Sequence, residues 1–193
     1  LVRLIISVKS EYALTQIKTG QEQQGIELAR RLTALGVTLN EVRVVADTTV
    51  AVEGAIRDLA EKSALIITSG GLGPTDDDGT RAAMAALAGT TLYEDPDLAA
   101  GIKARYERLG RDWIALNLKQ ALIPTGALAL PNRHGTAPGF AITHGNCVVA
   151  SLPGPPRELR GMLDDHLGTL LNEAGIEAKP VVEHCVRVFG VTE

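Results

Sequence analysis

The sequence predicts an α/β domain of three layers, in which a mostly parallel sheet is flanked by helices on both faces. Apolar or β-branched runs at residues 1–8, 39–45 and 64–68 have the composition of strands. Segments 22–35 and 50–62 lie between these runs and carry apolar residues at helical spacing. Such alternation of strands and helices is typical of right-handed crossovers in a parallel sheet.

The helices are justified by their apolar faces and their stop signals. The segment 22–35 ends at Gly36, and an alanine-rich helix that starts at Arg81 ends at Gly89. Glycine is common after the last helical turn because it adopts the left-handed conformation without strain. We therefore expect both helices to end where the glycines stand.

The second half of the sequence adds a helical lobe and an antiparallel hairpin, which His144-Gly145-Asn146 closes as a tight turn. Residues 1–174 are expected to form one domain. Residues 175–193 read as a linker and the start of a small following domain that is truncated here. The remaining elements expected are helices at 97–109, 113–122 and 157–174 and strands at 128–130, 140–143 and 147–151.

Composition and charge limit the classes of function. Hydrophobic residues make up 45% of the chain and charged residues 22%, as in ordinary soluble proteins. The net charge of −4 argues against partnership with nucleic acid or a membrane surface, because both are negatively charged. Cys147 and Cys185 are too few for a zinc cluster and are expected to be reduced thiols of a cytoplasmic protein. The four histidines show no short ligand spacing.

One stretch, residues 63–80, combines a buried strand, a glycine loop, an acidic cluster and a helix start. Glycines allow a backbone to approach a ligand closely, and amide groups at a helix start favour anions, so the loop suits a phosphate or diphosphate. The carboxylates of Asp77 and Asp78 would repel a phosphate oxygen at 4 Å by roughly 4 kcal/mol at an effective dielectric near 20. A divalent cation such as Mg²⁺ between them reverses that sign, so both are candidate metal ligands.

The alternative for this stretch is a solvated turn in which Asp78 or Thr80 caps the following helix. Two known phosphate motifs are excluded. Residues 70–75 have no Gly-Lys-Ser/Thr ending, so they do not form a P-loop. They also lack the third glycine of a dinucleotide fingerprint.

Three predicted strand ends are expected to share one ligand crevice, because ligands of open α/β sheets bind beyond the carboxyl ends of strands. The strand exits carry Glu11, Asp47 and the loop 70–80. Asp47 has the alternative role of a helix-start cap before Val50. The loop 132–139, rich in Gly, Thr and Pro, suits a ligand flap.

Four stretches with unusual glycine, proline and amide content occur in a fixed order: Gly70–Thr80 (GGLGPTDDDGT), Asn117–Ala121 (NLKQA), Leu130–Phe140 (LPNRHGTAPGF) and Leu152–Leu159 (LPGPPREL). Together they resemble the motifs of the CinA family (competence/damage-inducible protein A). The N-terminal domain of that family is similar to molybdopterin-binding domains of the MoaB/MogA type.

The resemblance implies a nucleotide-processing domain with metal-dependent ADP-ribose pyrophosphatase activity, which uses Mg²⁺ or Co²⁺. Asp47, Asp77 and Asp78 are implied as catalytic residues, the last two as metal ligands. The implied partner is a nucleotide-like small molecule, and relatives of this fold often form homo-oligomers. The implied substrate-binding residues are Glu11, Gly70, Gly71, Gly73, Thr75, Thr80, Gly135, Thr136, Pro153, Gly154 and Pro155.

The first turn departs from the family pattern, because Lys9 and Thr15 stand where glycines are expected. Either this turn binds differently, or catalysis is impaired while binding persists. Two alternatives to the pyrophosphatase therefore stay open: a molybdopterin-binding, adenylyltransferase-like domain and a non-catalytic nucleotide-binding domain. The deamidase activity of the family's separate C-terminal domain is not assigned to this chain.

Overall fold

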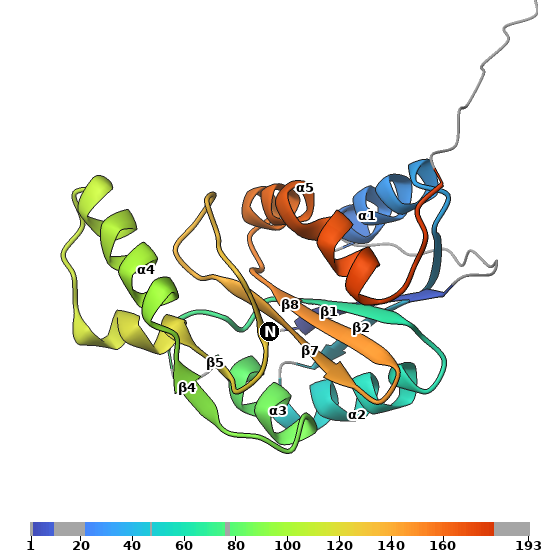
Figure 1. The fold of residues 1–193 in the computed structure, drawn as a ribbon, viewed down its shortest axis with the longest axis horizontal. Helices are drawn as coiled ribbons and strands as arrows, with labels where there is room; N and C mark the ends of the chain where they lie inside the picture. The colour runs from blue at the N-terminus through green and yellow to red at the C-terminus, as the bar shows by residue number, and fades with distance from the viewer. Residues whose placement is uncertain (1, 10–21, 47, 76–77, 180–193) are drawn as a thin grey trace, which may run out of the picture.

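The computed structural model describes residues 2–9, 22–46, 48–75 and 78–179 (Figure 1). Within them, no helix is both long enough and apolar enough to cross a bilayer. The elements, in chain order, are β1 (Val2–Lys9), α1 (Glu22–Ala34), β2 (Thr38–Ala46), α2 (Thr49–Ala60), β3 (Leu65–Ser69), α3 (Thr80–Leu87), β4 (Leu92–Glu94), α4 (Pro96–Arg108), the 3₁₀ helix η1 (Ala115–Ala121), β5 (Leu122–Pro124), β6 (Leu128–Leu130), β7 (Gly139–His144), β8 (Cys147–Leu152) and α5 (Pro156–Glu173).

The central sheet has six strands in the order β2-β1-β3-β8-β7-β6. Only β3 and β8 pair in parallel, whereas the other neighbouring pairs are antiparallel. Following these pairings, β2, β3, β8 and β6 point in one direction, and β1 and β7 point in the other. The predicted fold class is confirmed, with four of six strands sharing a direction, and the predicted hairpin joins β7 to β8.

The expected parallel arrangement of the first three strands is wrong. Strand β1 is antiparallel to both β2 and β3, with Val8 opposite Leu65 and Leu4 opposite Ser69. The carboxyl end of β1 thus lies beside the start of β3, at the edge of the sheet away from Gly70. The apolar runs of β1 and β2 predicted strands correctly, but an apolar run carries no information about strand direction.

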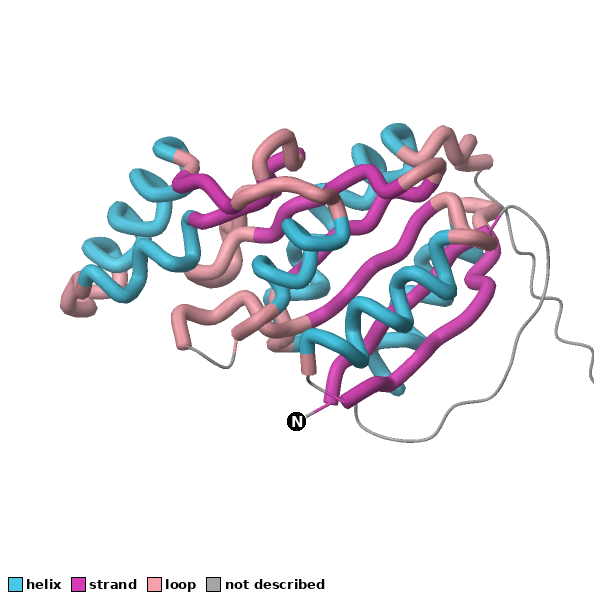
Figure 2. Tube along the Cα trace, turned by 90° about the horizontal axis from the view of Figure 1, so that it is seen from below, coloured by secondary structure: helices cyan, strands magenta, loops and turns pink. Residues whose placement is uncertain are grey.

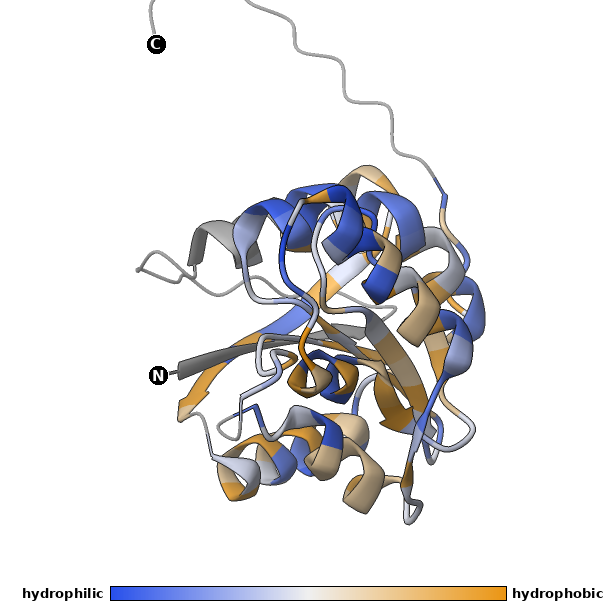
Figure 3. Ribbon diagram, turned by 90° about the vertical axis from the view of Figure 1, so that its left-hand side faces the viewer, coloured by the Kyte–Doolittle hydropathy of each residue, from blue (hydrophilic) through white to orange (hydrophobic). Residues whose placement is uncertain are grey.

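Two hydrophobic cores lie on opposite faces of the sheet and make the domain three-layered (Figure 1). Helices α1 and α5 cover one face, where Leu28 and Leu163 pack against Ile67 and Ala150. Helices α2 and α3 cover the other face, where Ile56, Met84 and Phe140 form the second core. The helices show both hydrophobic and hydrophilic segments, and strongly hydrophobic segments also lie along the strands (Figure 3).

A lobe built from α4, η1 and the two-stranded sheet β4-β5 extends from one side of the domain (Figure 2). The predicted helix 97–109 is confirmed as α4. The segment predicted as a helix at 113–122 is the shorter 3₁₀ helix η1. Tyr106 of α4 and Trp113, which lies just before η1, make an edge-to-face contact with ring centroids 5.7 Å apart.

Candidate functional site

Three loops meet at one edge of the sheet, beside the carboxyl ends of β3 and β8. The parallel pairing of these strands places residues 70–73 next to residues 153–155, and Gly70 N donates to Leu152 O at 2.9 Å. Strand β7 starts at the same edge, because Phe140 near its start lies opposite Ser151 near the end of β8. The loop 131–138, which leads into β7, therefore lies at this edge as well. Together the loops enclose a cavity of about 290 Å³, which we call the glycine-loop cavity.

The glycine-loop cavity collects most of the described residues that the sequence predicted for the site. Four further residues on its wall were not predicted as site residues: Leu72, Gln120, Ala137 and Glu158. The predicted residues that line it are Gly70, Gly71, Gly73, Asp78, Thr136, Pro153, Gly154 and Pro155.

The conformation of the loop after β3 requires glycine. Gly70 has φ +103° and Gly71 has φ +68°, a region in which residues with a side chain are strained. The two loops are also in close contact, because a Cβ built on Gly154 would lie 3.3 Å from the Cα of Gly70. The glycines thus let the loops after β3 and β8 pack backbone against backbone.

Arg81, at the start of α3, holds this loop from beneath. The side chain is 5% exposed, and its guanidinium donates to Leu72 O at 2.5 Å and to Gly73 O at 3.0 Å. Burial lowers the pKa of Arg81 to about 10, and the nearby negative charge of Asp78 opposes that shift. The group remains a cation at neutral pH. Sequence reasoning missed Arg81, because a single arginine in an alanine-rich helix gives no signal of burial.

The bonds to Arg81 and Thr80 orient the peptide groups of the loop. Thr80 is fully buried, and its hydroxyl donates to Gly70 O at 3.0 Å. In a trans peptide the carbonyl and the following N–H point in opposite directions, and no described peptide is cis. The carbonyls of Gly70 and Leu72 turn toward the protein, so the N–H groups of Gly71 and Gly73 point the other way and are oriented to meet an anion.

The carboxylate of Asp78 is held within the loop by hydrogen bonds from Thr75. Its Oδ2 accepts hydrogen bonds from Thr75 N at 3.0 Å and from Thr75 Oγ1 at 2.6 Å. The carboxylate also lies against Gly73, where an added Cβ would meet Oδ2 at 2.4 Å. The alternative in which Asp78 or Thr80 caps α3 is wrong, because the N-cap is Gly79 and no side chain caps the helix.

The donor set of the cavity fits a hard divalent cation with few protein ligands. Asp78 and Glu158 line the same cavity, and Glu158 Oε2 accepts from Asn132 Nδ2 at 2.8 Å. Mg²⁺ takes one or two carboxylates and completes its shell with water and phosphate. The described part of the chain holds no group of three or more His, Cys, Asp or Glu side chains arranged for a metal.

Glu11, Asp47 and Asp77 lie outside the described residues, so their predicted roles stay predictions. The crevice expected at the end of β1 is not formed by that strand, because its carboxyl end lies at the other edge of the sheet. The cap of α2 is Thr48, whose Oγ1 accepts from Ala51 N at 3.3 Å. The alternative role of Asp47 as that cap is therefore wrong.

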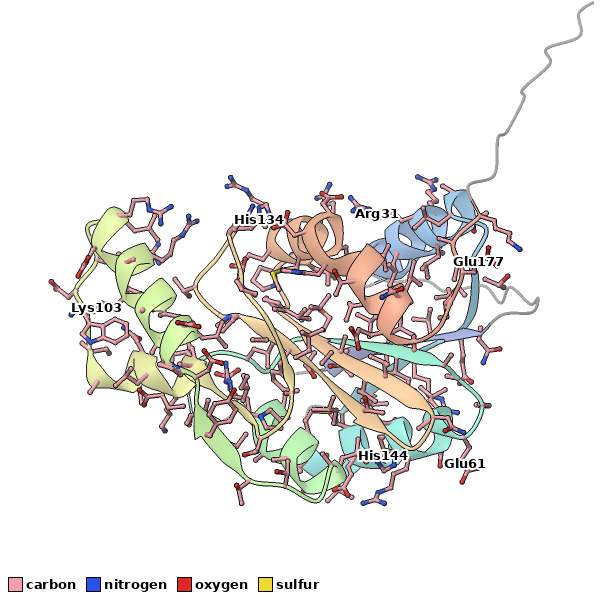
Figure 4. The ribbon with its side chains drawn as sticks, in the orientation of Figure 1. Arg31, Glu61, Lys103, His134, His144 and Glu177 are labelled. Atoms are coloured by element: carbon pink, nitrogen blue, oxygen red, sulfur yellow. The ribbon has the colours of Figure 1, made fainter. Side chains whose placement is uncertain are left out.

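The loop 131–138, which contains all but the last residue of the predicted flap 132–139, is anchored to α5. His134 Nε2 lies 3.0 Å from Asp165 Oδ2, and His166 Nε2 lies 2.9 Å from the carbonyl oxygen of Pro131. Figure 4 shows His134 beside α5, at the far end of the domain from His144. Gly135 passes close to Glu158, because an added Cβ would lie 1.7 Å from Oε2.

The fold and the loops at its edge define a domain of the molybdopterin-binding class. Residues 4–173 match the family model described as "Probable molybdopterin binding domain". A Mog protein of molybdopterin biosynthesis from Mycobacterium ulcerans has this fold, with a TM-score of 0.52, 24% identity, and coverage of 82% of this chain and 90% of that one.

Within this class, the chain belongs to the CinA family. The crystal structure of CinA from Thermoplasma acidophilum matches with a TM-score of 0.67 and 34% identity, over 79% of this chain and 88% of that one. A "Putative competence-damage inducible protein" of Moorella thermoacetica is 40% identical over 166 residues, 86% of this chain and 40% of that protein. A CinA-like protein of Deinococcus deserti is 43% identical over 159 residues, 82% of this chain and 39% of its own length. The chain thus spans about two fifths of the length of the Moorella and Deinococcus relatives.

Proposed function

We propose that this domain binds a phosphorylated small molecule of the pterin or nucleotide type in the glycine-loop cavity. The observation that carries the proposal is the meeting of three motif-bearing loops around one cavity of about 290 Å³. The oriented N–H groups of Gly71 and Gly73 supply donors for a phosphate. The family description, a molybdopterin-binding domain, supports the pterin-type ligand.

Calorimetric titration with molybdopterin, AMP and ADP-ribose tests this proposal. The variant Gly73→Val fills the cavity and displaces the Asp78 carboxylate, because the new Cβ would lie 2.4 Å from Oδ2. We expect it to weaken binding at least tenfold, or about 1.4 kcal/mol. Gly168→Val is the matched control, because a Cβ at this exposed position of α5 meets nothing within 4 Å. Equal affinities of the Gly73→Val and control proteins would contradict the proposal.

A second candidate function is metal-dependent hydrolysis of a nucleotide diphosphate such as ADP-ribose. The observation that favours it is the pair of carboxylates, Asp78 and Glu158, on the wall of the glycine-loop cavity. These residues, with Asp77 as the predicted further ligand, would hold Mg²⁺ or Co²⁺. A bound divalent cation supplies charge neutralisation at a phosphoryl oxygen and a more acidic water.

Release of AMP from ADP-ribose in the presence of Mg²⁺ or Co²⁺ tests the second candidate. Asp78→Ala removes a carboxylate from the cavity and is expected to abolish release, whereas Asp164→Ala, on the exposed side of α5, should leave it intact. Undiminished release by Asp78→Ala would exclude the assigned site. Thermal stabilisation by ADP-ribose without any AMP would instead favour the non-catalytic binding domain. Pyrophosphate release from ATP in the presence of molybdopterin would identify adenylyl transfer.

A further inference from the structure

A second and larger cavity, of about 570 Å³, lies between α4 and the loop 131–138. Leu98 and Ile102 of α4 form one side of it, and Pro131 and Pro138 stand on the loop side. Gly101 widens it, because this helical glycine presents no side chain and an added Cβ would meet nothing within 4 Å. We call this space the arginine cavity, after Arg105, Arg108 and Arg133 on its wall.

The charge of the arginine cavity is opposite to that of the glycine-loop cavity. Its wall carries three arginines and two aspartates, Asp95 and Asp97, which gives a net charge of +1. Asp95 is engaged as the N-cap of α4, where Oδ1 accepts from Asp97 N at 3.0 Å and from Leu98 N at 2.9 Å. The glycine-loop cavity has two charged residues on its wall, Asp78 and Glu158, and a net charge of −2.

Arg105 carries a donor without an acceptor. Its Nε is buried, and no described residue accepts a hydrogen bond from it. A buried donor that loses water and gains no partner costs about 1–3 kcal/mol, so proteins rarely leave one unmatched. The Nε and terminal nitrogens of arginine form a planar fork that matches two oxygens of a phosphate. Arg105 lines the cavity of 570 Å³, where a guanidinium fork suits an oxyanion ligand.

The two cavities are neighbours. Thr136 lines both of them. The side chain of Asn132, on the arginine side, donates to Glu158 Oε2 at 2.8 Å on the glycine-loop side. One ligand can therefore extend past Thr136 and occupy both the arginine cavity and the glycine-loop cavity.

We propose that the arginine cavity binds a phosphoryl group of the ligand whose other part lies in the glycine-loop cavity. This inference rests on the proposed function, because it assigns the second half of the same ligand. It requires no metal, since the arginines themselves compensate the phosphoryl charge. The ligand is then a small molecule whose phosphoryl group is separated from a second polar part, as the diphosphate of a nucleoside diphosphate linked to a sugar is separated from the base.

Titration calorimetry with ADP-ribose in the presence of EDTA tests this inference. Arg105→Gln removes the charge and the fork, and we expect it to weaken binding about tenfold and to reduce the dependence of affinity on salt. Gly101→Leu extends a side chain toward the cavity from a position where an added Cβ meets nothing within 4 Å, and it should weaken binding to a similar extent. Ala104→Leu is the matched control, because Ala104 is an exposed residue of α4 that does not line the cavity.

The outcomes separate this inference from the proposed function. Weaker binding by Arg105→Gln and Gly101→Leu, with Ala104→Leu equal to the wild-type protein, supports the arginine cavity. Wild-type affinity in Arg105→Gln and Gly101→Leu, or no binding of ADP-ribose by the wild-type protein in EDTA, overturns it. If these two variants weaken binding but Gly73→Val does not, the arginine cavity stands and the proposed role of the glycine-loop cavity fails. Thermal unfolding of each variant verifies that it is folded.

Discussion

The guanidinium of Arg81 donates to the carbonyl oxygen of Leu72 at 2.5 Å, from a position that is 5% exposed. This bond links the first turn of α3 to the centre of the glycine loop. Gln120 O also lies 3.5 Å from the same nitrogen, so the guanidinium spans the loop and η1. The orientation of the peptide groups in the loop thus depends on Arg81, a side chain that does not line the glycine-loop cavity.

Replacement of Arg81 by glutamine is expected to lower the free energy of unfolding by about 2–4 kcal/mol, because the carbonyls of Leu72 and Gly73 lose their charged donor. Chemical denaturation measures this. Replacement by lysine keeps the charge but loses the planar fork, so it should restore only part of the stability. A glutamine variant as stable as the wild-type protein would show that the loop holds its shape without Arg81.

Substitution of Gly70 by alanine is expected to destabilise the protein by about 1–2 kcal/mol, because φ +103° is strained for any residue with a Cβ. Gly54→Ala is the control. Gly54 lies within α2, an added Cβ meets nothing within 4 Å, and alanine there should stabilise by about 0.5–1 kcal/mol. Denaturation midpoints compare the two. Shifts of the same sign would refute the assignment of strain to Gly70.

Removal of the His134 side chain is expected to speed amide hydrogen exchange in the loop 131–138, because its contact with Asp165 at 3.0 Å anchors the loop to α5. His144→Ala, at the turn between β7 and β8, is the control (Figure 4). Exchange followed by mass spectrometry should show the increase in this loop and little elsewhere. Equal loop exchange in both variants would mean that the remaining contact, from His166 to Pro131, suffices as an anchor.

Cys147 should make the stability of the protein depend on pH in the alkaline range. The thiol is 0% exposed, and burial raises its pKa from 9.0 to about 11. The folded state then binds more protons than the unfolded state between these values, so this contribution to stability is complete below pH 9 and is lost as the pH rises toward 11. Unfolding free energies between pH 8 and 11 should fall more steeply for the wild-type protein than for Cys147→Ala. Equal pH dependence of the unfolding free energy in the two proteins would contradict the raised pKa of Cys147.

The turn after β3 followed from the sequence, because a buried strand that ends in glycines predicts a turn in conformations that favour glycine. Gly70 and Gly154 were predicted as site residues, and both line that cavity. The hairpin at His144-Gly145-Asn146 was predicted as well, and Gly145 has φ +59° there.

Other features left no local pattern in the sequence. The direction of β1 depends on its partners, and its apolar run is the same for either direction. Strands β4 and β5 have three residues each, which is too short for a period to be recognised. Arg81 becomes distinctive only when α3 packs beneath the loop and buries it.

The cavities and the β7-β8 turn occupy opposite ends of the same strands. Strand β8 runs for six residues from Cys147 beside the turn to Leu152 beside Gly70, which corresponds to roughly 20 Å at about 3.3 Å per residue. A fluorophore or a surface tether attached at Asn146 would therefore leave the entrance to both cavities unobstructed. Immobilised protein oriented in this way is suited to measuring how fast small phosphorylated molecules arrive and leave.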